Sequence, residues 1–163
     1  MNKVYIGLGS NLGDKVLNIK KAILELEKSF KLKKTSGFYK TSPVGYEAQS
    51  DFVNVVCCIT TELEPNELLD KLKGIEKKFL RDKGTCKWGP RTIDLDILLY
   101  SQGLVVDTDD LQVPHIYMHK RKFVLEPLAE IAPKLEHPIL NLTIEQLLDS
   151  LDTDEKVEKL EIL

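Results

Sequence analysis

Hydrophobic residues recur along this chain with two periods, and each change of period marks a new element. Apolar residues at every second position are typical of a strand with one buried face, and apolar residues three or four positions apart are typical of an amphipathic helix. The pattern predicts strands at about residues 2–9, 33–41, 51–62 and 92–100, and helices at about 15–30 and 65–80. This order, β-α-β-β-α-β, is that of the ferredoxin-like α+β fold.

The chain after residue 100 predicts smaller elements added to this core. The turn SQG precedes a short strand, LVVD, and a helical stretch that Pro127 and Pro133 interrupt. The last helix is expected to begin at Thr143, where Gln146 completes a capping box. After about residue 150 the tail is acidic and is expected to fray. We therefore expect one domain over residues 1–163, built as a three-layer α-β-α sandwich.

The strand predicted at residues 92–100 carries two aspartates. Its two faces are expected to hold Ile93, Leu95, Ile97 and Leu99 on one side, and Asp94, Asp96, Leu98 and Tyr100 on the other. Aspartate is depleted in strands, and two carboxylates about 7 Å apart on one face raise each other's pKa unless a cation compensates them. Mg²⁺ prefers carboxylate oxygens and the phosphate oxygens of a substrate. The pair therefore favours a magnesium–phosphate site, and the alternative is an edge strand whose aspartates face water and prevent pairing with another strand.

Positive charge is concentrated just before this strand. From Lys71 to Arg91 there are eight Lys or Arg residues and two acidic residues, so this segment carries +6, whereas the net charge of the chain is -3. A basic segment in an acidic protein favours a small polyanion and argues against general nucleic-acid binding. Its lysines up to residue 78 also fit a solvated helix face. The later basic residues of the segment lie in the predicted loop before the aspartates, and they are Arg81, Lys83, Lys87 and Arg91. Arg91 is a candidate phosphate partner.

Composition excludes several other classes of protein. The chain has 163 residues, 42% of them hydrophobic, which is enough for one globular core. No apolar run reaches the length of a membrane span, and no targeting signal is recognisable. Cys57, Cys58 and Cys86 have no metal-ligand spacing and are typical of a reduced protein. We expect a cytoplasmic monomer that binds small molecules, and neither nucleic acid nor membranes.

The stretch of residues 88–99 is more specific. Its sequence, WGPRTIDLDILL, closely resembles the signature of the 6-hydroxymethyl-7,8-dihydropterin pyrophosphokinases of folate biosynthesis. The pieces IGLGSNLGD, FYKTSPVG, DFVNVV and VPH also fit this family in order, and the likeness covers about residues 3–150. The resemblance implies a ferredoxin-like core that transfers pyrophosphate from ATP to the hydroxymethyl group of the dihydropterin and releases AMP.

The resemblance also implies roles for individual residues. It implies that Asp94 and Asp96 hold two Mg²⁺ ions that bridge the ATP phosphates and the pterin hydroxyl, and that Arg81 and Arg91 act in catalysis. The implied ATP-binding residues are Lys83, Lys87, Trp88, Arg91, Ile97, His115 and Arg121. The implied pterin-binding residues are Thr41, Ser42, Val44, Phe52, Asn54, Trp88, Asp94 and Phe123. Ile116 departs from members that have an aromatic residue at this position, which removes support for an adenine contact there.

Some of these residues also have a simpler interpretation. An inward phenylalanine on a strand usually belongs to the core, and Phe52 is assigned to the pterin because Asn54 shares its face and because the motifs occur in order. The stretch GLGSNLG has neither the G-x-G-x-x-G spacing nor a Walker lysine, so it indicates a tight strand-to-helix turn, and the alternative is that it helps to shape the pterin end. His119 and His137 are expected to be surface and loop residues, respectively.

Two other functions stay open at this point. The first is a non-catalytic ferredoxin-like module that binds nucleotide or RNA through its sheet. The negative net charge and the lack of an RNP-type aromatic motif count against it. The second is another Mg²⁺-dependent phosphoryl or nucleotidyl transferase on the same scaffold, which only substrate profiling distinguishes from the pyrophosphokinase.

Overall fold

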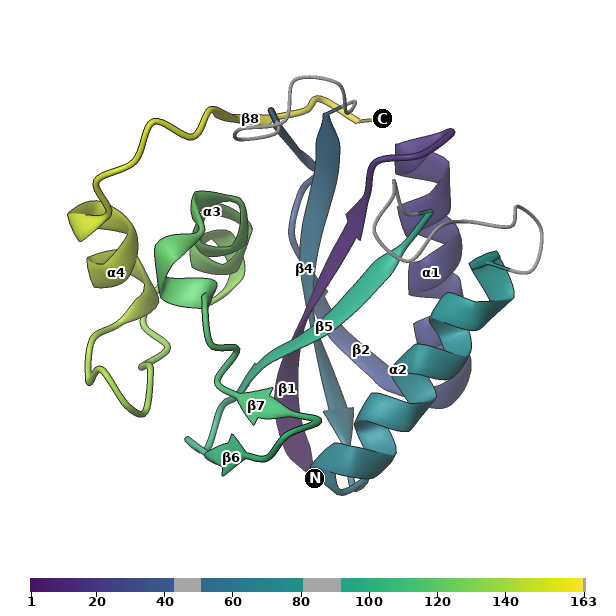
Figure 1. Cartoon of the computed structure of the whole chain (residues 1–163), viewed down its shortest axis with the longest axis horizontal. Coiled ribbons are helices and arrows are strands. Elements are labelled where there is room, and N and C mark those ends of the chain that lie inside the picture. The colour runs from purple at the N-terminus through teal and green to yellow at the C-terminus, as the bar shows by residue number, and fades with distance from the viewer. Residues whose placement is uncertain (43–50, 81–91, 163) are drawn as a thin grey trace.

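A six-stranded antiparallel sheet separates two layers of helices (Figure 1). The computed structural model describes residues 1–42, 51–80 and 92–162. The core elements are β1 (Asn2–Ser10), α1 (Lys15–Ser29), β2 (Lys31–Thr35), β3 (Tyr39–Thr41), β4 (Phe52–Thr61), α2 (Pro65–Leu80) and β5 (Asp94–Tyr100). The strand order is β5-β1-β4-β3-β8, and β2 also pairs with β4. The predicted order of elements is confirmed, with the strand predicted at 33–41 divided into β2 and β3.

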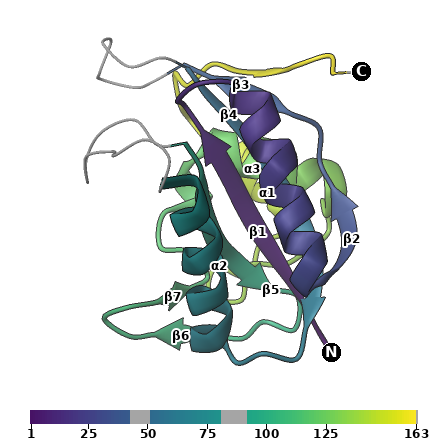
Figure 2. The same cartoon turned by 90° about the vertical axis from the view of Figure 1, so that its right-hand side faces the viewer.

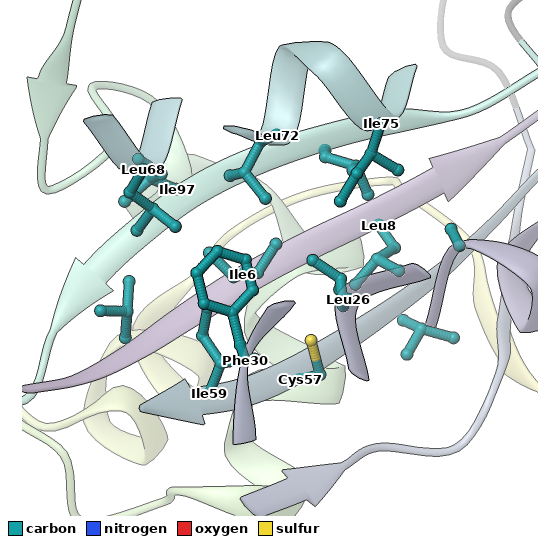
Figure 3. Packing of buried hydrophobic residues seen from close by; sticks show 14 of the residues in the cluster. Ile6, Leu8, Leu26, Phe30, Cys57, Ile59, Leu68, Leu72, Ile75 and Ile97 are labelled. Atoms are coloured by element: carbon teal, nitrogen blue, oxygen red, sulfur yellow. The ribbon is translucent and has the colours of Figure 1, made fainter. Parts of the chain in front are cut away.

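The two long helices cover one face of the sheet (Figure 2). The Asp14 side chain caps α1 by accepting a 3.2 Å hydrogen bond from the N–H of Leu17. The buried stripes of α1 and α2 pack against the alternating apolar side chains of β1, β4 and β5 (Figure 3). This first core cluster includes Ile6, Leu8, Leu26, Phe30, Cys57, Ile59, Leu68, Leu72, Ile75 and Ile97.

The second half of the chain contributes the helices that cover the opposite face of the sheet. Its elements are β6 (Val106–Asp107), β7 (Gln112–Val113), the 3₁₀ helix η1 (Met118–Lys120), α3 (Lys122–Ile131), α4 (Ile144–Ser150) and β8 (Val157–Lys159). Leu125 and Leu128 of α3 and Ile144 of α4 pack on the sheet in a second core cluster, so the three-layer α-β-α arrangement is confirmed. Within the described ranges, no helix combines the length and the apolar character needed to cross a bilayer.

In this half of the chain, the helix start predicted from a capping box is correct, and the helix interruption predicted from a proline is not. The capping box of Thr143 and Gln146 is present at the start of α4, as predicted. Pro127, however, lies inside α3, which continues to Ile131, so the predicted interruption at Pro127 is wrong. Pro127, Leu125 and Leu128 are all buried. The tertiary packing of this helix therefore outweighs the cost of one lost backbone hydrogen bond.

The alternation predicted for β5 fails at its carboxyl end. Tyr5 pairs with Leu99, but Ile6 pairs with Ile97, so the register shifts and Leu98 is the extra residue of a β-bulge. Leu98 and Leu99 therefore both belong to the second cluster, and Tyr100 belongs to the first. The predicted faces of Leu99 and Tyr100 are wrong.

The tail has a structure that the sequence did not predict. Val157–Lys159 form β8, which pairs with β3 in the register Thr41 to Val157 and Tyr39 to Lys159. Figure 1 shows the tail crossing from α4 to this edge of the sheet. The expectation that the tail frays after about residue 150 is therefore wrong for β8, because β3 supplies backbone partners that no local sequence pattern reveals.

Candidate active site

A pocket of about 400 Å³ lies on the face of the sheet that α3 and α4 only partly cover. Residues from β1, β3, β4, β5, the start of α3 and the C-terminal tail line it. They are Gly7, Leu8, Gly9, Thr41, Ser42, Phe52, Asn54, Val55, Val56, Asp94, Asp96, Leu98, His115, Arg121, Phe123, Val124 and Glu155.

The floor of the pocket is a row of residues that runs across three strands. Gly9 of β1 pairs with Asn54 of β4 on one side and with Asp94 of β5 on the other. A Cβ atom on Gly9 would lie 2.9 Å from Asn54 Oδ1, so only glycine leaves room at this point. Two strand spacings separate the backbones of Asn54 and Asp94 by about 10 Å. The row thus places an amide and a carboxylate on opposite sides of a glycine.

The paired aspartates lie at one end of this floor. Asp94 is half-buried and Asp96 is exposed, whereas Leu95 between them is buried in the first core cluster. Gly7 of β1 pairs with Asp96, so a second glycine lies beside the second carboxylate. The alternation of β5 therefore holds in this part of the strand, and it directs both carboxylates to the pocket while the core anchors their backbone.

His115 and Arg121 bring nitrogen donors to the same end. The backbone N–H of His115 donates a 2.8 Å hydrogen bond to the carbonyl of Leu98, and His115 Nδ1 accepts one of 3.2 Å from the N–H of Tyr117. Burial lowers the pKa of His115, and the charge of Arg121 lowers it further, against an opposing effect of Asp96. The histidine is therefore neutral near pH 7 with Nε2 as its donor, because Nδ1 acts as an acceptor.

The guanidinium of Arg121 lies between two aromatic rings. Its Cζ atom is 5.4 Å from the centroid of the Tyr117 ring and 5.6 Å from that of Phe123. Such cation–π contacts hold a long side chain in one orientation without using its N–H groups. The N–H groups of Arg121 can then serve an anionic ligand.

The other end of the floor has polar and aromatic character. Asn54, only 9% exposed, donates a 3.3 Å hydrogen bond from Nδ2 to Oγ1 of Thr41. This contact fixes the orientation of the amide and leaves Oδ1 on the side of Gly9. Phe52 and Phe123 also line the pocket and provide aromatic faces. An end of this kind suits a flat, nitrogen-rich ring.

Nearly all the described residues that the sequence predicted for the site meet in this pocket. Thr41, Ser42, Phe52, Asn54, Asp94, Asp96, His115, Arg121 and Phe123 line it. Ile97 does not, because its side chain lies in the first core cluster on the other face of the sheet, near Leu68 (Figure 3). Val44, Arg81, Lys83, Lys87, Trp88 and Arg91 lie outside the described residues.

The lining residues that the sequence did not predict for the site are Gly7, Leu8, Gly9, Val55, Val56, Leu98, Val124 and Glu155. Gly7 and Gly9 fall in the predicted strand 2–9 and in the stretch GLGSNLG, which favours a turn, although two glycines at alternate positions of a strand indicate a close approach to its surface. Glu155 carries no signal in the sequence, since only the path of the tail brings it to the pocket.

Asp94 and Asp96 are the candidate metal ligands among the residues that line the pocket. No group of three or more His, Cys, Asp or Glu side chains in the described part of the chain could hold an ion by itself. Asp94 and Asp96 supply carboxylate oxygens only, which suits a hard cation that takes its other ligands from water or from a phosphate.

Fold and pocket together define a class of protein: a ferredoxin-like α+β domain with a pocket for a small molecule and paired carboxylates at one end of it. Comparison with known families gives a more specific result. The chain belongs to the 7,8-dihydro-6-hydroxymethylpterin-pyrophosphokinase (HPPK) family, whose model matches residues 5–133. The resemblance seen in the sequence is thereby confirmed.

Individual relatives agree with this assignment. The chain is 48% identical over 139 residues to a 2-amino-4-hydroxy-6-hydroxymethyldihydropteridine pyrophosphokinase of Aquifex aeolicus, covering 85% of this chain and 86% of the relative. It is 44% identical over 137 residues to the enzyme of that name from Bacillus subtilis, covering 83% and 81%. Folic acid synthesis protein FOL1 of Dictyostelium discoideum is 44% identical over 146 residues, and the match covers 90% of this chain but only 22% of that protein.

Solved structures confirm the fold. The structure of Plasmodium falciparum HPPK-DHPS wild type with SDX-DHP matches with a TM-score of 0.69 at 18% identity. The match covers 91% of this chain and 43% of that one.

Proposed function

We propose that this chain transfers pyrophosphate from ATP to the hydroxymethyl group of 6-hydroxymethyl-7,8-dihydropterin and releases AMP. The row Asn54–Gly9–Asp94 is the observation that carries the proposal. It joins a ring-recognising amide to the paired carboxylates across a distance of about two strand spacings. A bicyclic pterin spans such a distance, with its amide edge at Asn54 and its hydroxymethyl group at the aspartates.

The proposed pterin end recognises the ring by shape and by polar edges. Asn54 offers both a donor and an acceptor to the ring, and Thr41 holds its amide in place. Phe52 and Phe123 supply the faces for stacking, as the family resemblance implies. Gly9 allows the ring to lie directly on the strand backbone.

The proposed phosphate end neutralises charge and orients the reacting groups. Asp94 and Asp96 would hold Mg²⁺, which supplies charge neutralisation and a lowered pKa for a bound alcohol. The positions of the two carboxylates on one face of an anchored strand fit this role. His115, as a neutral donor, and Arg121, as a cation, would bind the ATP phosphate oxygens. Such transfers depend mainly on positioning and electrostatics, so no strong general base is required.

The remaining expected residues complete this proposal. Arg81, Lys83, Lys87, Trp88 and Arg91 are proposed to contact ATP and the reacting groups, and Trp88 and Val44 are also proposed at the pterin end. Ile97 is proposed to contact ATP through its backbone only, because its side chain is in the core.

We further propose that the protein is a cytoplasmic monomer that does not bind nucleic acid. Cys57 and Cys58 are both buried and unpaired, which supports a reducing compartment. The net charge of -3 supports the proposal that the protein does not bind nucleic acid.

The direct test is to incubate the protein with MgATP and 6-hydroxymethyl-7,8-dihydropterin and to quantify the nucleotide products by chromatography. We expect AMP, formed only when the pterin is present. The formation of ADP, or the lack of any AMP, would contradict the proposal.

A pair of variants links this activity to the aspartates. Asp96→Asn should lower kcat by at least about a hundredfold, because it removes one charge from the reacting end. Asp110→Asn is the matched control, since Asp110 is an exposed residue of the turn between β6 and β7 and does not line the pocket. Equal activity of the two variants would exclude the role assigned to Asp96.

A further inference from the structure

The C-terminal tail makes a contact with the pocket that the family match does not cover. The family model ends at residue 133, whereas Glu155 of the tail lines the pocket together with Phe123. The role of residues 153–160 at the pocket therefore does not follow from the match to the family.

Several contacts between distant elements fix the path of the tail. Lys159 Nζ forms a 2.9 Å ion pair with Glu130 Oε1 of α3. Glu130 also accepts hydrogen bonds from the hydroxyl of Tyr39, at 2.6 Å, and from the N–H of Gly37, at 2.9 Å. The N–H of Leu160 donates to the carbonyl of Phe38. The tail is thus attached both to the sheet edge and to α3, so its position relative to α3 is well defined.

Within this fixed path, the Glu155 carboxylate reaches the amino end of α3. Its Oε2 atom accepts a 3.2 Å hydrogen bond from the N–H of Lys122, the first residue of the helix. The Glu155 N–H in turn donates to Thr153 Oγ1, also at 3.2 Å, which orients the residue.

Helix α3 has no cap from the residue that precedes it. That residue, Arg121, makes no side-chain capping bond within the described part of the chain, and the first turn of the helix contains no acidic residue. A free N–H group at a helix start requires an acceptor, and a negative charge there also complements the helix dipole. Glu155, which lies 33 residues further along the chain, supplies both the acceptor and the negative charge.

The start of α3 matters because it carries two pocket residues. Arg121 and Phe123 flank Lys122, and the Arg121 guanidinium packs on the Phe123 ring. We propose that Glu155 is a positioning residue, which caps α3 from the tail and thereby holds Phe123 and Arg121 in the geometry that the pterin and phosphate ends need. The identity of the ligands rests on the proposed function, but the cap does not.

Two substitutions at Glu155 test the cap. Glu155→Ala removes the acceptor, and the KM for the dihydropterin should rise about fivefold, the effect expected for one lost helix cap, with a smaller change in kcat. Glu155→Gln retains an oxygen that can accept from Lys122 N–H and should restore most of the affinity. Glu158→Ala is the matched control, because Glu158 is an exposed glutamate of the same tail, and it should behave like the wild type.

Amide hydrogen exchange tests the same contact without any ligand. Exchange at Lys122 should be faster in the Glu155→Ala variant than in the Glu158→Ala variant. Equal exchange at Lys122 in both variants would overturn the positioning role. It would also be overturned if the wild type uses the dihydropterin as a substrate and Glu155→Ala leaves the KM unchanged. Failure of the wild type to use the pterin would instead contradict the proposed function, and hydrogen exchange would still decide on the cap.

Discussion

The carboxylate of Glu76 in α2 accepts a 2.9 Å hydrogen bond from the backbone N–H of Leu95, the residue between Asp94 and Asp96. In the described part of the sheet, strand β5 lies at the edge, with β1 on one side only. Its outward N–H groups face no further strand there, and Glu76 provides the acceptor that such a strand would have supplied. The strand is fixed at the point where its two carboxylates project into the pocket.

We predict that Glu76→Ala impairs both stability and activity. The Leu95 N–H would lose its acceptor while the Leu95 side chain stays buried, and an unsatisfied donor of this kind costs about 1–3 kcal/mol of unfolding free energy. Small movements of the strand would also displace the aspartates, so kcat should fall. Urea unfolding and the AMP-release assay measure the two effects.

Two further variants provide the controls for this prediction. Glu76→Gln retains an oxygen acceptor and should recover most of the lost stability. Asp70→Ala changes an exposed acidic residue on the same helix and should have little effect on either measurement. The interpretation would be wrong if Glu76→Ala were no less stable than Asp70→Ala.

Gly9 and Gly74 should respond in opposite ways to the same substitution. A Cβ on Gly9 would lie 2.9 Å from Asn54 Oδ1, so Gly9→Ala should displace this amide and weaken pterin binding by about tenfold while the protein still folds. Gly74 lies in α2, where a Cβ would meet no atom of the described residues within 4 Å apart from its own helix backbone. Gly74→Ala should therefore raise the unfolding free energy by about 0.5–1 kcal/mol and leave binding unchanged. Calorimetric titration with the pterin and thermal unfolding distinguish these outcomes.

The spacing of hydrophobic residues along the chain was sufficient to predict the order of helices and strands and the end of the site that holds the two aspartates. The alternation around Asp94 and Asp96 depends on short-range geometry, and it holds because Leu95 and Ile97 are anchored in the core. The bulge at Leu98 could not be predicted in this way, since it arises from the pairing of β5 with β1, about 90 residues away in the chain.

Long-range contacts explain what the sequence left out of the site. Asn54 and Phe52 were found because they share a strand face and fit the motifs of a family. Glu155 was missed because its partner, the Lys122 N–H, is a backbone group, and nearly every residue type has one. Gly9 could have been found, because a glycine inside a strand often marks a close approach.

Thr41 and Thr60 form a second matched pair. Thr41→Val removes the hydroxyl that accepts from Asn54 Nδ2, so the amide would lose its fixed orientation and the KM for the pterin should rise severalfold. The buried Oγ1 of Thr60 has no hydrogen-bond partner among the described residues. Thr60→Val should therefore be neutral or stabilising, by up to about 1 kcal/mol, with unchanged kinetics. A rise in KM for Thr60→Val as large as that for Thr41→Val would rule out a specific role for the Thr41 hydroxyl.

We predict that the titration of His137 lowers the free energy of unfolding in mild acid relative to neutral pH. Its ring is buried, and Nδ1 accepts hydrogen bonds from the N–H groups of Ile139 and Leu140. Burial lowers the pKa of His137, and the neighbouring His119, with ring centroids 6.1 Å apart, lowers it further. Between this lowered value and the unfolded value of about 6.5, the unfolded chain binds more protons than the folded protein, so the unfolding free energy must fall as the pH falls through that window.

The substitution His137→Asn isolates this contribution. Asparagine has an oxygen that can accept from the same backbone N–H groups but does not titrate, so the unfolding free energy of the variant should depend less on pH below about 6.5. His115, whose pKa is also lowered, is present in both proteins, and its effect cancels in the difference. Urea unfolding from about pH 5 to pH 8 gives the two curves, and the difference between them should become constant at the alkaline end. Parallel curves across the whole range would show that His137 does not titrate differently on folding.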